Sequence, residues 1–157
     1  LLPIFTKYAR NVMMPSSVVL DANIAIYSVL KTPHSAIAVQ VINQLIQEDT
    51  QLFAPSLWWF EVTSVIHNYH FARLISDSIA YSALEILTTE WGVQKVDVPE
   101  RSAFDWATRL HHKAAYDGFY LAAAEKLGAE FWTANKALTN NTRQLGLGWV
   151  HWMGEIE

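Results

Sequence analysis

Three acidic residues, Asp21, Glu61 and Asp117, lie far apart in the sequence, and each adjoins an apolar or small-residue segment. Carboxylate oxygens without His or Cys partners are ligands that favour Mg²⁺ or Mn²⁺ over zinc. A divalent ion held by such oxygens lowers the pKa of water and neutralises charge on a phosphate, which is the chemistry of phosphodiester hydrolysis. The three residues therefore suggest a metal-dependent hydrolase, provided that the fold brings them together.

Asp21 directly follows the apolar run Ser17–Leu20, which suits a buried strand. The ordinary interpretation of Asp21 is an N-cap of the helix that we expect to run to about Leu30. Asn23 either shares that cap or assists a metal ion. The position at the end of a strand is compatible with both interpretations.

Glu61 lies in a helix that begins at Pro55-Ser56, and its neighbours on the same helical face are Leu57, Trp58 and Val65. Burial of an unpaired carboxylate costs several kcal/mol or shifts its pKa. Glu61 therefore requires a metal ion or an Arg as partner, unless the helix is rotated so that Glu61 faces solvent.

Asp117 lies in the first turn of a helix expected over residues 115–127, where the helix dipole favours an acid. The small residues Gly118 and Ala122–Ala124 allow this helix to pack closely and to bring Asp117 near the sheet. Thr133 and Asn135 end a further strand in the same way as Asp21. They offer neutral oxygen ligands, or they cap the next helix.

The rest of the chain alternates short apolar runs with helical stretches. This alternation implies a parallel sheet covered by helices on both faces, with right-handed crossovers. Ligands of such sheets bind beyond the carboxyl ends of the strands, so the acids should meet there. We expect strands over 17–20, 51–54, 93–98, 130–133 and 148–151, with 93–98 near an edge, and helices over 22–30, 35–48 (Ser35 as N-cap), 56–70, 76–89, 99–112, 115–127 and 136–145.

The composition limits the class of protein. The 157 residues fit one domain, and the absence of Cys excludes disulfides and thiolate zinc sites, which suits a reducing cytoplasm. No apolar run reaches the roughly 20 residues of a membrane span. The net charge of −4 lacks the basic footprint of most nucleic-acid-binding proteins. Two divalent ions bound to three carboxylates would reverse the local charge from negative to positive.

Four segments in this order resemble the PIN-domain family, and most closely its VapC-type toxins of bacterial toxin–antitoxin pairs. The resemblance covers about residues 17–152. It is carried by Val-Leu-Asp-Ala-Asn (19–23), Pro-Ser-Leu-Trp-Trp-Phe-Glu-Val (55–62), Tyr-Asp-Gly-Phe-Tyr-Leu-Ala-Ala-Ala-Glu (116–125) and Phe-Trp-Thr-Ala-Asn-Lys-Ala-Leu (131–138).

The resemblance implies an α/β three-layer sandwich with a five-stranded parallel sheet in order 3-2-1-4-5, flanked by about seven helices. It assigns catalytic and metal-binding roles to Asp21, Glu61 and Asp117, with Mg²⁺ or Mn²⁺ as cofactor. The family's usual fourth acid falls on Asn135, which removes one charge and leaves open whether one or two ions bind. Thr133 and Asn23 are expected to support the site.

The implied activity is endoribonucleolytic hydrolysis of RNA by a cytoplasmic protein that forms a homodimer, is inhibited by a cognate antitoxin and has no membrane partner. We interpret residues 1–16 as an N-terminal extension, either native or introduced by cloning, and residues 17–157 as the PIN domain. Apolar faces on the helices from Ser35 and Ser56 indicate an interface.

Other functions fit the residues less well. A catalytically weak or inactive PIN-like module that binds RNA or protein is motivated by Asn135 and by the acidic charge. A haloacid-dehalogenase-type phosphatase requires a second carboxylate two residues after Asp21, where Asn23 stands. A response-regulator receiver requires an acidic pair before the first helix. His67 and His70 have the spacing of a zinc pair but lack a third ligand nearby, and Trp58, Trp59 and Trp132 are expected mainly in the core.

Overall fold

The computed structural model describes residues 15–156. Its five strands form one parallel sheet in the order β3-β2-β1-β4-β5, as the resemblance implied. The strands are β1 (Ser17–Leu20), β2 (Gln51–Pro55), β3 (Gln94–Val96), β4 (Glu130–Thr133) and β5 (Val150–Trp152). Of the extension predicted over 1–16, residues 1–14 lie outside the described residues, as does residue 157.

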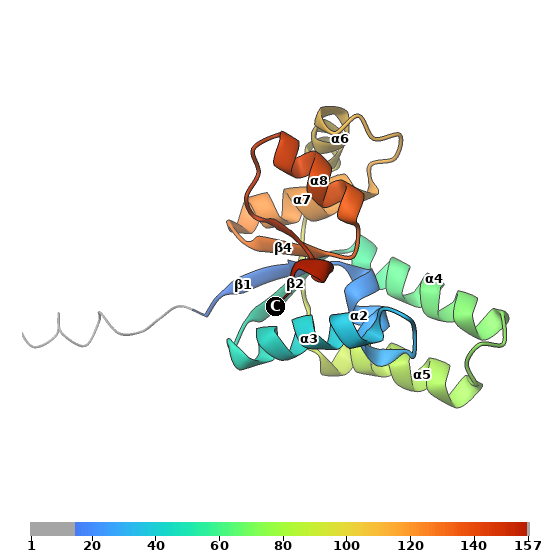
Figure 1. Ribbon diagram of the computed structural model, residues 1–157. Helices are drawn as coiled ribbons and strands as arrows, with labels where there is room; N and C mark the ends of the chain where they lie inside the picture. Colours follow the sequence, from blue (N-terminus) through green and yellow to red (C-terminus); the bar gives the residue numbers. More distant parts are fainter. Residues whose placement is uncertain (1–14, 157) are drawn as a thin grey trace, which may run out of the picture.

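Seven α-helices occur in the described part of the chain, the number expected, and they cover both faces of the sheet. In Figure 1, α6, α7 and α8 lie on one side of the strands and α2, α3 and α5 on the other, with α4 extending from the strand ends. The helices are α2 (Ala22–Val29), α3 (Ser35–Gln47), α4 (Leu57–Phe71), α5 (Asp77–Glu85), α6 (Glu100–Arg109), α7 (Tyr116–Leu127) and α8 (Lys136–Gln144).

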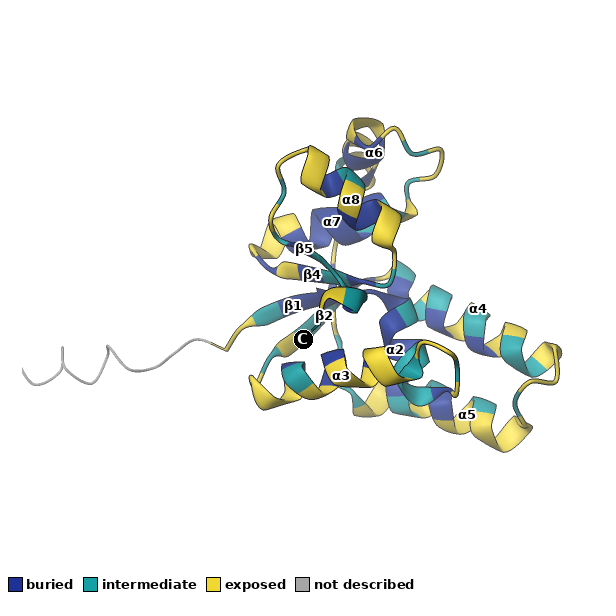
Figure 2. Cartoon of the chain, viewed as in Figure 1, coloured by how far each residue is buried: buried dark blue, intermediate teal, exposed yellow. Residues whose placement is uncertain are grey.

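The core lies between the sheet and the two helical layers. Figure 2 shows that α7 and parts of the strands are buried, whereas much of α5 and the outer end of α4 are exposed. The largest fully buried side chains include Trp58 and Phe131. Trp59 and Trp132 pack against this core, which confirms that these tryptophans are mainly structural. Within residues 15–156, no helix combines the length and the apolar character that crossing a bilayer requires.

Several predicted element boundaries were wrong. Ser35 is the first residue of α3 and not its N-cap, which is His34. The Ser35 hydroxyl instead donates to the carbonyl oxygen of Leu30 at 2.7 Å, so it closes the preceding turn. Two apolar residues of α3, Ile37 and Ile46, are exposed.

Other elements also differ in length from the prediction. Strand β3 is confined to Gln94–Val96, and it is the edge strand that the alternating pattern indicated. The helix expected over 76–89 ends as an α-helix at Glu85 and continues as a π-helical turn over Ile86–Glu90. Helix α6 ends at Arg109 because His111 adopts a positive φ of 56°, which an α-helix cannot accommodate.

Gly118 sets the distance between α7 and α6. A Cβ atom at Gly118 would lie 2.2 Å from the carbonyl oxygen of Ala103, well inside van der Waals contact. The obstacle is backbone, so a larger residue must separate the helices. The close packing inferred from the small residues of this segment is therefore confirmed, although its partner at Gly118 is α6 and not the sheet.

Gly118→Ala is expected to lower the free energy of unfolding by about 1–3 kcal/mol, the usual cost of overpacking. Denaturant unfolding of the metal-free protein measures this. Gly148→Ala is the matched control, since an added Cβ there meets nothing within 4 Å and should change stability by less than about 0.5 kcal/mol. Equal unfolding midpoints for the two variants would contradict the close contact.

Candidate functional site

Asp21 lies at the carboxyl end of the central strand β1 and is held by a dense set of donors. Its Oδ1 accepts from the backbone N–H of Asn23 at 3.1 Å, which makes Asp21 the N-cap of α2. Its Oδ2 accepts from the Thr133 hydroxyl at 2.9 Å and from the Ala134 N–H at 3.0 Å. Asp21 is buried. Asp21 can therefore cap α2 and also belong to the candidate site, since the same carboxylate lies at the carboxyl ends of the strands.

The sheet register explains why Thr133 reaches Asp21. Leu20 of β1 pairs with Trp132 of β4, so the residues that follow them lie side by side. The Thr133 hydroxyl accepts from the N–H of Asn135 at 3.0 Å, and this fixes the direction in which it donates to Asp21. Thr133 thus orients the first acid.

Asn135 takes the structural role that the sequence left open. Its Oδ1 accepts from the N–H of Leu138 at 3.1 Å and caps α8. The backbone N–H of Asn23, similarly, supports the carboxylate of Asp21. Both residues lie at the carboxyl edge of the sheet, next to Asp21 or Thr133.

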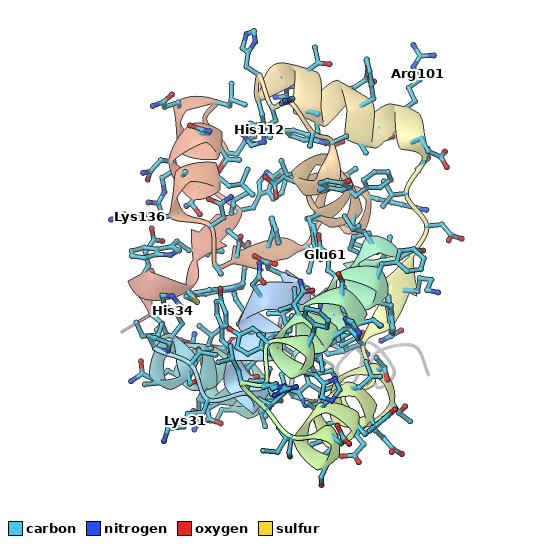
Figure 3. The ribbon with its side chains drawn as sticks, turned by 90° about the vertical axis from the view of Figure 1, so that its right-hand side faces the viewer. Lys31, His34, Glu61, Arg101, His112 and Lys136 are labelled. Atoms are coloured by element: carbon cyan, nitrogen blue, oxygen red, sulfur yellow. The ribbon has the colours of Figure 1, made fainter. Side chains whose placement is uncertain are left out.

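Glu61 and Asp117 approach the same edge from two further helices. The hydroxyl of Tyr120 in α7 donates to Glu61 Oε2 in α4 at 2.6 Å, across a sequence separation of 59 residues. Asp117 Oδ2 lies 3.4 Å from Nδ1 of His112. Figure 3 looks onto the carboxyl edge and places Glu61 near its middle, with His112 above it and Lys136 to one side.

The three acids lie close enough for their charges to affect one another. Burial raises the pKa of each of them, and the charge of Asp21 raises the pKa of both Glu61 and Asp117 further. For Glu61 the result is a pKa of about 7, although the hydrogen bond from Tyr120 acts in the opposite direction. Among residues 15–156, no Lys or Arg forms an ion pair with any of the three carboxylates.

This donor set fits a hard divalent cation. Three carboxylates at reduced solvent exposure with no Lys or Arg partner in the described chain need positive charge, and oxygen ligands select Mg²⁺ or Mn²⁺. In residues 15–156, no three His, Asp or Glu side chains are arranged so that they could hold an ion together. Mg²⁺, however, is commonly bound by one or two carboxylates and completes its shell with water and substrate phosphate. Asp21 with a second carboxylate meets that requirement.

The sequence did not indicate two of the contacts. Tyr120 and His112 each contact one of the predicted acids. The signal for Tyr120 was its position three residues after Asp117, on the same face of α7. His112 could not be paired with Asp117 from the sequence, because the connection between α6 and α7 has no regular periodicity.

The raised pKa values predict an unusual pH dependence of stability. Between about pH 4.5 and about pH 7, folded Glu61 keeps a proton that the unfolded chain has released. The folded state then binds more protons, so the free energy of unfolding falls as pH rises through this window. Asp21 and Asp117 act in the same direction because their pKa values are also raised.

We therefore expect the metal-free protein to unfold at a lower temperature at pH 7 than at pH 5, and Glu61→Gln to reduce that difference. Thermal denaturation in EDTA across this range measures it. Glu85→Gln, which changes an exposed carboxylate of α5, is the control and should leave the slope unchanged. A native protein whose stability rises steadily from pH 5 to pH 7 would refute the assignment.

Comparisons with known proteins agree with this architecture. The structure of PAE2754 from Pyrobaculum aerophilum is similar, with a TM-score of 0.60 and 17% identity over 90% of this chain and 92% of that chain. The structure of VapBC2 from Rickettsia felis, bound to a promoter DNA fragment, has a TM-score of 0.61 and 16% identity over 87% of this chain and 98% of that chain. The structure of FitAcB from Neisseria gonorrhoeae has a TM-score of 0.60 and 18% identity over 88% of this chain and 99% of that chain. At these identities the likeness shows the fold.

A search of curated proteins found no match. The family model of the PIN domain, by contrast, matches residues 18–144, which contain all three acids as well as Thr133 and Asn135. This match spans most of the chain, and the chain therefore belongs to the PIN domain family.

Proposed function

We propose that this protein is a metal-dependent ribonuclease that hydrolyses RNA phosphodiester bonds, with Asp21, Glu61 and Asp117 as its catalytic acids. The observation that carries the proposal is the approach of three partly or fully buried carboxylates, without a Lys or Arg partner in residues 15–156, to the carboxyl edge of a PIN-domain sheet. Ligands of parallel α/β sheets bind at this edge.

Asp21 and Asp117 are the proposed principal ligands of Mg²⁺ or Mn²⁺, and Glu61 is either a further ligand or the group that orients the attacking water. When bound, such an ion supplies Lewis-acid activation of water and neutralises charge on the phosphate. Thr133 and the Ala134 N–H hold Asp21 in place through its Oδ2. Asn135 contributes no charge, and its Oδ1 is engaged in capping α8.

The test is cleavage of RNA in the presence of Mn²⁺ or Mg²⁺ and in excess EDTA. We expect cleavage with either ion and its loss in EDTA, recovered when the ion is restored. Undiminished cleavage in EDTA would disprove the metal mechanism. Calorimetric titration of the protein with Mn²⁺ gives a second, independent readout.

The same titration distinguishes an alternative, a catalytically weak or inactive PIN-like module that binds RNA or protein. This alternative is favoured by Asn135, a neutral residue in the place where the family resemblance expects an acid. A chain that binds RNA, but neither binds Mn²⁺ nor cleaves RNA, would be such a module.

We further propose that the protein is the toxin of a cytoplasmic toxin–antitoxin pair and forms a homodimer. The support is the sequence resemblance to VapC-type toxins and the likeness in fold to VapBC2 and FitAcB. The test is a short reading frame next to the gene. If the product of that reading frame binds this chain and inhibits RNA cleavage, the proposed antitoxin partner is supported.

The dimer is supported by large exposed apolar side chains on α4 and on the α4–α5 connection, a feature typical of interaction sites. They are Phe60 at 70%, Phe71 at 81% and Leu74 at 69% exposure. Size-exclusion chromatography with light scattering counts the subunits, and a monomer at high concentration would remove the dimer from the proposal.

A further inference from the structure

Tyr120 is a buried tyrosine whose hydroxyl lies at the centre of the candidate site. Only 3% of the residue is exposed, and its ring stacks on Phe131 of β4 with the centroids 5.4 Å apart and the planes 8° from parallel. This packing fixes the ring, so the hydroxyl has little freedom to move. Its one proton is donated to Glu61 Oε2 at 2.6 Å.

The Tyr120 hydroxyl connects the two helices that carry Asp117 and Glu61. Tyr120 belongs to α7, one turn after Asp117, and its hydroxyl donates to Glu61 of α4. The backbone N–H of Ala22, the first residue of α2 and the neighbour of Asp21, lies close enough to that hydroxyl to oppose the rise of its pKa that burial causes. A single rigid group therefore relates the positions of Asp117 and Glu61.

The hydrogen bond also restricts what Glu61 can do. Within residues 15–156, the Tyr120 hydroxyl is the only group that donates a hydrogen bond to the Glu61 carboxylate. It occupies Oε2 and leaves Oε1 for another partner. A carboxylate held in this way is poorly suited to bind an ion through both oxygens, but it keeps one oxygen in a defined place to accept a proton or a hydrogen bond.

A purely structural explanation exists, because buried Tyr hydroxyls usually find some hydrogen-bond partner. Two features favour a functional one. The partner is a carboxylate that is close enough to Asp21 and Asp117 to be affected by their charges. The donor also comes from the helix that carries Asp117, so that one hydrogen bond sets the distance between two of the acids.

We propose that Tyr120 is a positioning residue that holds Glu61 through Oε2, so that Glu61 orients the attacking water through Oε1 and does not bind the metal ion through both oxygens. This inference rests on the proposed nuclease function and selects between the two roles that were left open for Glu61. On this proposal, loss of the Tyr120 hydroxyl lowers turnover more than it weakens binding of the ion.

Tyr120→Phe removes the hydroxyl and keeps the ring. We expect kcat for RNA cleavage to fall about 10-fold to about 100-fold, the usual effect of removing a group that orients an active-site ligand. We expect the KM for RNA and the dissociation constant for Mn²⁺, measured by calorimetry, to change less than about 3-fold, because the principal ligands remain. A loss of Mn²⁺ binding as large as the loss of kcat would show that Glu61 is a direct ligand and would overturn the assigned role.

Tyr116→Phe is the matched control, since it removes a hydroxyl from the same helix at an exposed position, and it should leave kcat unchanged. Combining Tyr120→Phe with Glu61→Gln tests the pathway. If Tyr120 acts through Glu61, the double variant has the same kcat as Glu61→Gln alone. A further loss equal to that caused by Tyr120→Phe in the native background would mean that Tyr120 acts independently of Glu61.

The outcomes separate this inference from the function on which it rests. A native chain that cleaves RNA with Mn²⁺, together with a fully active Tyr120→Phe variant, refutes only the role of Tyr120. A native chain that neither binds Mn²⁺ nor cleaves RNA refutes the proposed function, and the role of Tyr120 falls with it. Thermal denaturation shows that each variant is folded at the assay temperature, so that a lower kcat cannot be attributed to unfolded protein.

Discussion

Asp21→Asn is expected to abolish calorimetric Mn²⁺ binding and to lower the rate of RNA cleavage by more than about 100-fold. Groups that merely orient metal ligands are worth about 10–100-fold in metal affinity or activity, so loss of a principal ligand should exceed that range. Asp21 is the acid at the end of the central strand, and its charge raises the pKa of both other acids. It therefore contributes to the negative field that attracts a cation.

The same substitution is expected to destabilise the fold. The two oxygens of Asp21 accept three hydrogen bonds, and Oδ2 alone accepts from the Thr133 hydroxyl and from the Ala134 N–H. An amide nitrogen in the place of Oδ2 would face two donors. The hydroxyl can rotate and accept instead, but the backbone N–H cannot, and a buried donor without a partner costs about 1–3 kcal/mol.

Denaturant unfolding in EDTA, Mn²⁺ calorimetry and an RNA cleavage assay measure these three effects on one preparation. Asp105→Asn changes an exposed aspartate of α6 and is the control, with no expected change in any of them. If Asp21→Asn kept Mn²⁺ binding and activity, Asp21 would be a helix cap and nothing more.

Much of the architecture could be predicted from the sequence because its signals are local. The apolar run before Asp21 marks the end of a strand, and Gly128, which follows α7, adopts the left-handed φ of 60° that is typical of a glycine at the end of a helix. The order of the strands, by contrast, came from the resemblance to PIN domains. Periodicity alone gives strands and helices but does not say which strands are neighbours.

The errors have a common physical origin. Ser35 has the chemistry of an N-cap, but its hydroxyl is used by the preceding turn, so His34 takes the cap position without a side-chain hydrogen bond. Ile46 fits the apolar pattern of α3, yet it is 70% exposed. Tertiary contacts decide such cases, and a pattern within one helix does not contain them.

The candidate site shows the same division. Each acid alone also had an ordinary structural interpretation, and the resemblance to PIN domains was what grouped the three as one site. Their mutual placement could not be derived, since it depends on contacts such as that between Tyr120 and Glu61, 59 positions apart. The sequence predicted the components, and the packing of α4 and α7 around β1 determines their geometry.

Asp117→Asn is expected to be as inactive as Asp21→Asn but to have the opposite effect on stability in EDTA. Burial and the charge of Asp21 raise the pKa of Asp117, so its ionised form is less favourable in the metal-free fold than in the unfolded chain. Its recorded polar contact in residues 15–156 is with His112 at 3.4 Å, too long for a strong hydrogen bond. Replacing the carboxylate with an amide therefore relieves repulsion and leaves no buried backbone donor unpaired.

In EDTA at neutral pH, Asp117→Asn should be at least as stable as the native protein and about 1–3 kcal/mol more stable than Asp21→Asn, the cost of the unpaired N–H in the latter. Both substitutions remove one negative charge from the same cluster. The difference between the free energies of unfolding of the two variants therefore reports the hydrogen bonds around Asp21, because the electrostatic effect is common to both variants.

Adding Mn²⁺ should reverse the order of the native protein and Asp117→Asn. A ligand that binds only the folded state stabilises it by about 2.7 kcal/mol when its free concentration is about 100 times the dissociation constant. The native protein gains this free energy, whereas a variant without a principal ligand gains little. A thermal denaturation series with increasing Mn²⁺ would show the two curves crossing. If Mn²⁺ stabilised both proteins equally, Asp117 would not be a ligand; if it stabilised neither, Asp21 and Asp117 would not form a metal site.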